Sequence, residues 1–288
     1  MLALTMEPST LYTAGFGVGT TVALLVLLRG LQRVFSPMHR LARTNDAWRL
    51  LQVGHVFAVF LLGAAVVKHG IAGVDLVADL TVAAVYGVLG LVVIQLTGAI
   101  STRTLFSAQL RAELDRGNVA AGVAAGAHHV AIGVLASRAV VGGDLADVGL
   151  ALAFFVIAMI SHAGFVALYR LLTTYDDAEQ IHGENMAAAV SYAGITVAVA
   201  ILIARALTGE GEFPGWTAAL QGFGGVALFA LGLYPVRQIV VQSLMLGARP
   251  TLRGGAIDAA VAGDHNTALA ALEATSYLAT ALSIAVLA

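Results

Sequence analysis

The chain has 288 residues, of which 59% are apolar and only 11% are charged, and its mean hydropathy is +0.89. Soluble domains carry about 25% charged residues, so this composition excludes an ordinary soluble protein and indicates a protein embedded in a lipid bilayer. The net charge of −2 points to no particular partner, and nucleic acid is not expected as one. There is no cysteine, which excludes disulfides and thiolate metal sites.

Eight apolar stretches are long enough to cross a bilayer, for which a helix needs about 20 residues. The first ten residues lack the basic segment that should precede the apolar core of a secretory signal, so no such signal is expected. Ala, Gly and Val dominate the stretches, and such small residues predict closely packed helices. The predicted spans are Leu11–Phe35, Trp48–Lys68, Leu76–Ile100, Val119–Val141, Leu145–Leu171, Met186–Ala206, Trp216–Leu246 and Thr267–Leu287.

The basic residues are divided unequally between the two sides of this topology. Of the 15 Arg and Lys residues, 12 lie on the side of the longer loops that follow spans one, three, five and seven, and Arg237 is counted among them. Only Lys68, Arg138 and Arg205 lie on the other side. Short loops rich in Arg and Lys stay in the cytoplasm, which predicts that both termini are outside.

An Asn followed by a helix of small residues recurs four times, at Asn45, Asn118, Asn185 and Asn266. The spacings of 73, 67 and 81 residues each correspond to two spans with their loops. Because two spans return the chain to the same side, the pattern predicts four parallel two-helix repeats rather than inverted ones. Each Asn is expected to be a helix N-cap. The alternative is a ring of four Asn residues around a cytoplasmic vestibule with pseudo-fourfold symmetry.

The surroundings of the second and third Asn resemble a known family. The stretches are Glu113-Leu-Asp-Arg-Gly-Asn-Val-Ala-Ala and Ile181-His-Gly-Glu-Asn-Met-Ala-Ala-Ala. They are similar to the DUF350 (UPF0719) family of bacterial inner-membrane proteins, although Asn45 lacks the preceding Gly and the last copy reads Gly263-Asp-His-Asn. The resemblance implies a multi-pass all-α membrane protein of the inner membrane with two four-helix domains, at residues 10–142 and 145–288. It implies no activity.

Polar side chains recur near the predicted bilayer centre. Positions seven, ten and eleven after each Asn share one helix face, about 10 to 16 Å along the helix axis. Gln95 and His162 lie on the neighbouring spans, each 23 residues before the next Asn. If the helices that start with Asn enclose a common interior, these groups form a polar layer. The candidate site therefore comprises Gln52, His55, Gln95, His128, His129, His162, Tyr192 and Glu273.

Each of these side chains also has a structural explanation, because single polar residues often hydrogen-bond between membrane helices. Glu273 is the exception, since a charged group at this depth costs about 2.5 kcal/mol or more. It is expected to be protonated, paired with a His or in contact with water. Bis-His haem ligation by His55 and His128, or a divalent metal held by His128, His129, His162 and Glu273, are open alternatives, but no cofactor or metal is predicted.

No catalytic motif, such as a phosphate-binding loop or a nucleophile elbow, is present, so an enzyme is not expected. Two functions fit the sequence: a transporter or channel for a small solute or ion, proton-coupled through Glu273 and His128/His129, or a non-catalytic scaffold that assembles as a homo-oligomer or with another membrane protein. A haem or metal redox protein is a third reading. The acidic stretch Asp176-Asp177-Ala-Glu179 is expected to be a solvated linker, or else a docking point for a cytoplasmic partner.

Overall fold

The computed structural model describes residues 8–35, 44–73, 75–105, 109–140, 147–207 and 215–287. Within these ranges the regular elements are all helices, and eight are long and apolar enough to cross a membrane. The eight-span, all-helical prediction is thereby confirmed, although the predicted span ends Val141 and Leu145 lie outside the described residues. The long helices are α1 (Pro8–Phe35), α3 (Asp46–Gly70), α4 (Leu76–Leu105), α6 (Val119–Ala139), α7 (Val148–Leu172), α9 (Met186–Ala206), the composite span Trp216–Met245, and α13 (Thr267–Leu287).

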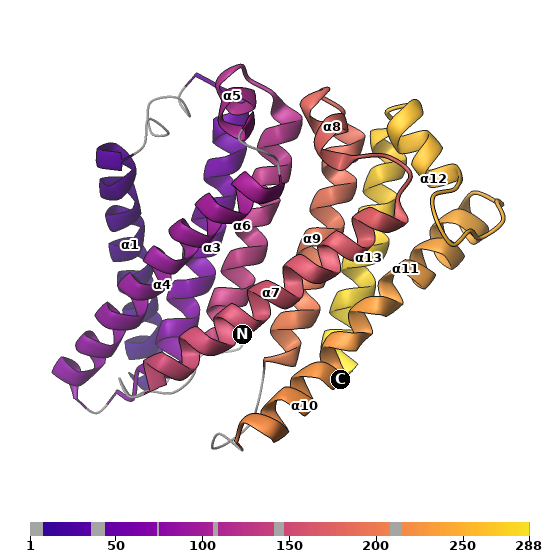
Figure 1. Ribbon diagram of the computed structural model, residues 1–288. Coiled ribbons are helices and arrows are strands. Elements are labelled where there is room, and N and C mark those ends of the chain that lie inside the picture. The colour runs from indigo at the N-terminus through magenta and orange to yellow at the C-terminus, as the bar shows by residue number, and fades with distance from the viewer. Residues whose placement is uncertain are drawn as a thin grey trace, which may run out of the picture.

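The four helices that follow the repeated Asn residues pack side by side in the order α3, α6, α9, α13 (Figure 1). Their small residues allow the backbones to touch. A Cβ atom added to Gly133 of α6 would lie 2.4 Å from the Cα of Ala58, and one added to Gly194 of α9 would lie 2.4 Å from the Cβ of Ala274. Close approach of this kind lets dispersion contacts hold membrane helices together where lipid offers no hydrophobic driving force.

Helices α4 and α7 and the composite span Trp216–Met245 cross this row obliquely, whereas α1 runs beside α3 (Figure 1). Helix α4 packs on α3 and α6, α7 packs on α6 and α9, and α10 (Trp216–Ala227) packs on α9. Helix α1 packs on α3 and α4. The spans therefore form two layers, and each oblique helix α4 and α7 bridges two consecutive members of the row.

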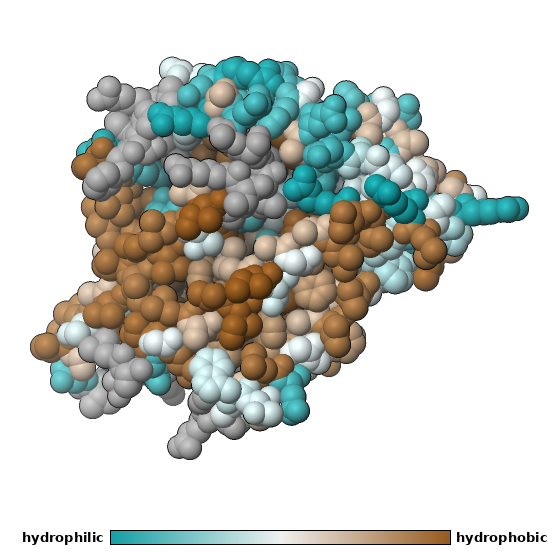
Figure 2. Space-filling model, in the orientation of Figure 1, coloured by the Kyte–Doolittle hydropathy of each residue, from teal (hydrophilic) through white to brown (hydrophobic). Residues whose placement is uncertain are grey.

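Short helices lie at one end of the bundle: α5 (Leu110–Asp115), α8 (Asp177–His182), and α12 (Ala256–Asp258) with the π-helical η5 (Ala259–Gly263) (Figure 1). Each comes directly before one of the Asn residues that start a row helix. Hydrophilic residues gather at this end, whereas hydrophobic residues cover the long helices (Figure 2). This distribution is the one expected of a protein whose long helices are surrounded by lipid.

The seventh span is irregular. After α10 it continues as the 3-10 segment η3 (Leu228–Gly232), the single turn α11 (Leu233–Val236) and the π-helical η4 (Arg237–Met245). Pro235 explains the change, because proline has no amide hydrogen and its ring clashes with the carbonyl four residues earlier. Helix segments of the π type are frequent at functional sites. The first residue of η4, Arg237, lies in the protein interior, where none of its surface is exposed.

Candidate functional site

Each repeated Asn accepts hydrogen bonds at the start of its own helix. The Oδ1 atom of Asn45 accepts from the Ala47 amide at 2.9 Å, and that of Asn185 accepts from Ala187 at 2.9 Å. Asn118 and Asn266 accept from the amides three residues later, at 3.1 and 3.0 Å. These bonds satisfy amide groups that a helix leaves without an internal partner.

The same side chains also join each repeat to the next. The Nδ2 atom of Asn45 donates to the carbonyl oxygen of Leu114 at 2.7 Å, that of Asn118 to Ile181 at 2.8 Å, and that of Asn185 to Val261 at 2.8 Å. Each acceptor lies in the short helix before the next Asn. These bonds thus connect the Asn residues in a line along the row of helices.

The histidines of the candidate layer lie in two pairs. The His55 and His129 rings stack between α3 and α6, with centroids 4.0 Å apart, and the His128 and His162 rings lie 6.0 Å apart between α6 and α7. His55 and His129 each place Nδ1 near the carbonyl oxygen four residues earlier, at 3.0 and 2.9 Å. Since a carbonyl only accepts, Nδ1 carries the hydrogen in both rings.

The remaining contacts of the predicted layer differ from residue to residue. Gln95 interacts with His55, His162 directs Nε2 to the Thr196 carbonyl oxygen at 2.9 Å, and Tyr192 interacts with Thr196. Gln52 is buried on α3, and neither polar atom of its side chain has a hydrogen-bond partner among the described residues. The structure therefore brings His55, Gln95 and His129 together and pairs His128 with His162, whereas Glu273 belongs to a separate set of contacts. No cluster of three or more metal-ligating side chains occurs in the part of the chain that the structure describes.

Glu273 is the centre of a different cluster. Arg237 donates from Nε to Glu273 Oε1 and from Nη2 to Asp258 Oδ1. The side chains of all three residues are at most 1% exposed. Ser191 donates its hydroxyl to the other Glu273 oxygen at 2.7 Å. The expectation that Glu273 would be protonated, paired with His or in contact with water omitted this partner: the carboxylate is paired with an arginine on the irregular span.

Asp258 joins the cluster to the loop after α7. Its Oδ2 atom accepts from the Thr174 amide at 2.6 Å and from the Thr174 hydroxyl at 3.1 Å. The guanidinium carbon of Arg237 also lies 5.5 Å from the centre of the Tyr234 ring, a distance at which a cation and an aromatic face attract. One donor is left over, because Arg237 Nη1 is buried and has no acceptor among the described residues.

Asp177 of α8 extends the cluster toward the hydrophilic end of the bundle. Its side chain is 7% exposed and pairs with Arg170 Nε at 3.3 Å. Burial raises the pKa of Asp177 to about 7, because the opposing effect of Arg170 is outweighed and the negative charges of Glu273 and Asp258 act in the same direction as burial. The acidic stretch is therefore not entirely the solvated linker expected from the sequence. Its second residue is an interior group.

The sequence profile described as Domain of Unknown Function (DUF350) matches residues 5–140 and 144–288. The chain belongs to the DUF350 family. The predicted resemblance and the tandem arrangement of two copies are confirmed by this match. Neither the curated proteins nor the solved structures contain a match to the chain.

The two DUF350 copies carry different polar interiors. The first copy contributes His55, Gln95, His128 and His129, whereas the second holds the ion pairs of Arg237. Reasoning from sequence missed Arg237 and Asp258, because Arg237 was counted among the loop charges. The available signal was a lone arginine eight residues before the end of the apolar span Trp216–Met245, two residues after a proline.

Proposed function

We propose that this DUF350 protein is a proton-coupled transporter of a small cation in the bacterial inner membrane, and that the cluster around Arg237 is its proton-binding site. The observation that carries the proposal is the buried Arg237 between Glu273 and Asp258. Charged groups inside a membrane are costly, and those that occur there mark ion pathways and proton relays. A purely structural role is a weak explanation, because well-packed apolar side chains stabilise an interior at least as well as a buried ion pair.

The charges of the cluster support exchange between a proton and a cation. With every group ionised, Arg170 and Arg237 contribute two positive charges, and Asp177, Asp258 and Glu273 contribute three negative charges, which leaves one excess negative charge. Because the pKa of Asp177 is about 7, a proton occupies this carboxyl below neutral pH and leaves above it. The deprotonated cluster attracts a cation, and the protonated cluster does not.

The topology that goes with this function has both termini outside and α5, α8 and α12 in the cytoplasm. It comprises four parallel two-helix repeats in two four-helix domains. Support comes from the position of the short helices at one hydrophilic end (Figures 1 and 2) and from the basic residues on that side. Arg237 is withdrawn from that count because it is buried within a span. In this orientation Asp177 exchanges protons with the cytoplasm.

Reconstitution in liposomes with a pH-sensitive dye tests the proposal. An imposed gradient of Na⁺ or K⁺ is expected to move protons through the wild-type protein, and E273Q is expected to abolish this movement while keeping a side chain of the same size. E179Q is the matched control, because Glu179 is an exposed acidic residue of α8. Proton movement that is equal in E273Q and E179Q, or absent from the wild type with both cations, contradicts the proposal.

Assembly is the second candidate function, and helix α13 supports it. The second position after each Asn is buried in the first three repeats, at Ala47, Ala120 and Ala187, because the next row helix covers it. The equivalent Ala268 of α13 is exposed, and so is Ala279 further along the same face. In α3, α6 and α9 the equivalent face packs on the next row helix. In α13 this face is exposed.

Crosslinking tests this alternative, because the chain has no native cysteine. A279C on α13 is expected to give an oxidised dimer in membranes if this face binds a second copy. V26C on the exposed side of α1 provides the control. Equal dimer yields from the two variants count against assembly through α13.

A further inference from the structure

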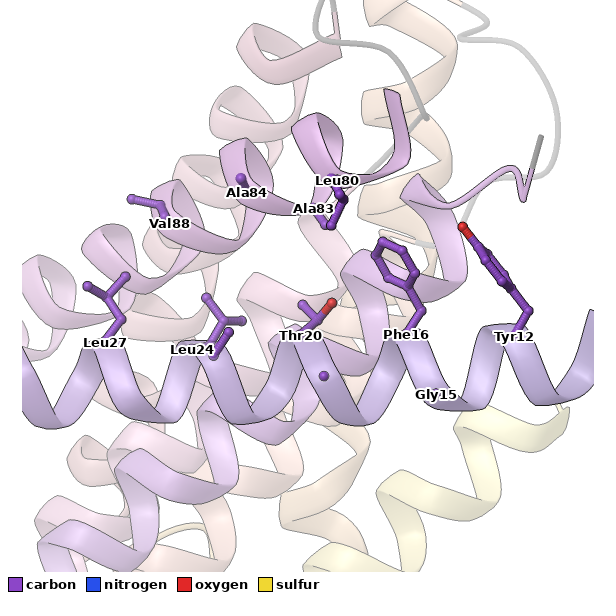
Figure 3. Close-up of a pocket in the computed structure, with 12 residues that line it drawn as sticks. Tyr12, Gly15, Phe16, Thr20, Leu24, Leu27, Leu80, Ala83, Ala84 and Val88 are labelled. Carbon is purple, nitrogen blue, oxygen red and sulfur yellow. The ribbon is translucent and has the colours of Figure 1, made fainter. Parts of the chain in front are cut away.

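Two of the grooves that border helix α1 are also lined by a neighbouring span. The first lies between α1 and α4, has a volume of about 680 Å³ and is lined by apolar side chains such as Phe16, Leu24 and Leu80, with Tyr12 at one end (Figure 3). The second has a volume of about 560 Å³ and is lined by Arg29 of α1 and by Arg49, Gln52, Val53, Val56, Phe57 and Phe60 of α3. The two differ in charge, because no charged residue lines the first and two arginines line the second.

The arginines lie at one end of the second groove. Arg49 is in the first turn of α3, four residues after Asn45, and Arg29 is near the end of α1 where the chain leaves that span. Arg29 is exposed, and the Arg49 side chain is 55% exposed in spite of its ion pair with Asp46. Basic side chains between helices at the cytoplasmic surface of a membrane bind the phosphate of anionic lipids.

Gln52 provides a second, independent indication of a ligand. It is 8% exposed, it lines the groove one turn below Arg49, and neither its Oε1 nor its Nε2 atom has a hydrogen-bond partner among the described residues. Buried polar groups are normally paired, and an unpaired one calls for an explanation such as a bound molecule. The two amide atoms are covered in this conformation, so an ester carbonyl accepts from Nε2 only after the side chain turns toward the groove, and it leaves Oε1 to another donor.

The remainder of the groove is apolar and exposed. Val53, Phe57 and Phe60 are 61%, 48% and 54% exposed and share one face of α3, since they are spaced by four and three residues. From Arg49 to Phe60 the helix rises by about 16 Å, which is close to half of the roughly 30 Å hydrocarbon thickness of a bilayer. The groove therefore has the length of one leaflet.

From this arrangement we infer that the groove between α1 and α3 binds one anionic glycerophospholipid. Arg29 and Arg49 hold the phosphate, Gln52 donates to an ester carbonyl, and the acyl chain lies along Val53, Phe57 and Phe60. No charged residue lines the groove between α1 and α4. A lipid chain can lie there, but the groove does not distinguish anionic from neutral headgroups. This inference concerns the first DUF350 copy and does not depend on the transport proposal.

Native mass spectrometry of the detergent-purified protein tests the inference. Phosphatidylglycerol and phosphatidylcholine with identical acyl chains are added separately, and the fraction of protein that retains one lipid is measured. The wild type is expected to retain phosphatidylglycerol preferentially. The double variant R29Q/R49Q is expected to lose about tenfold or more of this affinity, because each basic residue near an anionic lipid contributes roughly a factor of five.

Two further variants separate lipid binding from folding. R111Q removes an exposed arginine that does not line the groove and is expected to retain phosphatidylglycerol like the wild type. Q52L is expected to lower retention of phosphatidylglycerol by severalfold while raising the unfolding temperature of the lipid-free protein, since it removes an unpaired buried amide. Equal retention of the two lipids by the wild type, or unchanged retention in R29Q/R49Q, overturns the inference. Displacement of the lipid by inorganic phosphate alone also overturns it, because it assigns the site to free phosphate.

Discussion

Arg237 and Glu273 form an ion pair inside the membrane-spanning part of the second copy, between a π-helical segment and the last helix of the row. Neither side chain is more than 1% exposed. Asp258 binds the same guanidinium, so the three residues join the irregular span, the last row helix and the short helix before it.

Removal of the arginine alone is expected to be strongly destabilising. R237Q leaves Glu273 and Asp258 buried without their counter-ion, and loss of one partner from a buried pair costs about 3–5 kcal/mol. Denaturant unfolding in detergent measures this loss. R111Q is the control, with a cost below about 1 kcal/mol, because its ion pair with Asp115 is exposed. Equal costs for R237Q and R111Q contradict the structure of the cluster.

Replacement of the whole cluster separates function from stability. R237M/D258L/E273L removes the charges together, and such replacements of buried ion pairs are neutral or stabilising when the apolar side chains pack well. The triple variant is therefore expected to be more stable than R237Q and to lack transport. A triple variant that unfolds as easily as R237Q contradicts this account of its energetics.

Stability is expected to depend on pH through Asp177. An Asp carboxyl in an unfolded chain has a pKa of about 3.9. Burial raises the pKa of Asp177 to about 7 in the folded protein, which therefore holds this proton more tightly than the unfolded chain does. This stabilisation is present at acidic pH and is lost as the pH rises from about 4 through about 7. The free energy of unfolding is expected to fall over this range in the wild type. In D177N the part of this fall that comes from Asp177 is expected to disappear, and an unchanged pH profile contradicts the assignment.

Replacing different members of the Asn line with Ala is expected to lower the free energy of unfolding by different amounts. N118A and N185A each lose a helix cap of about 1 kcal/mol and a bond to the next repeat of about 1 kcal/mol. N266A is expected to lose the cap alone, since no bond from its amide to a further repeat occurs among the described residues. Unfolding free energies of the three variants measure the difference. Equal losses from N185A and N266A mean that the link between repeats contributes nothing.

Substitution of two glycines by Ala tests the helix packing, because one substitution is expected to destabilise the protein and the other to stabilise it. G194A places a methyl group 2.4 Å from Ala274 and is expected to destabilise by about 1–3 kcal/mol through overpacking. G222A has no atom within 4 Å of the added methyl group and is expected to stabilise by up to about 1 kcal/mol through helix propensity. The unfolding temperatures of both variants are compared with that of the wild type. Shifts in the same direction for G194A and G222A contradict the packing.

The spans and the Asn copies were predictable because their signals are local. Twenty apolar residues identify a helix such as Val119–Ala139 without knowledge of its neighbours, and Asn118 caps that helix through an amide three residues away. The pairing of Arg237 with Glu273 was not predictable, because it depends on the π-helical register after Pro235 and on the packing of two spans.

The neighbours of the histidines were likewise not predictable from the sequence. Their depth from the nearest Asn followed from the sequence, but the neighbours of each ring depend on which helix lies beside it. His55 and His129 stack although they occupy positions ten and eleven of their repeats, and His128 faces His162 of the second copy instead. Burial of Asp177 is also a tertiary effect, since nothing in the acidic stretch distinguishes it from its exposed neighbour Asp176.

The pH dependence of cation-driven proton flux in liposomes tests the central claim most directly. The wild-type flux is expected to change with a midpoint near pH 7, where Asp177 titrates. D177N is expected to lose this midpoint, and E273Q to lose the flux. A wild-type flux with no midpoint near neutral pH, or a flux that survives in E273Q, would contradict the assignment of the Arg237 cluster as the proton-binding site.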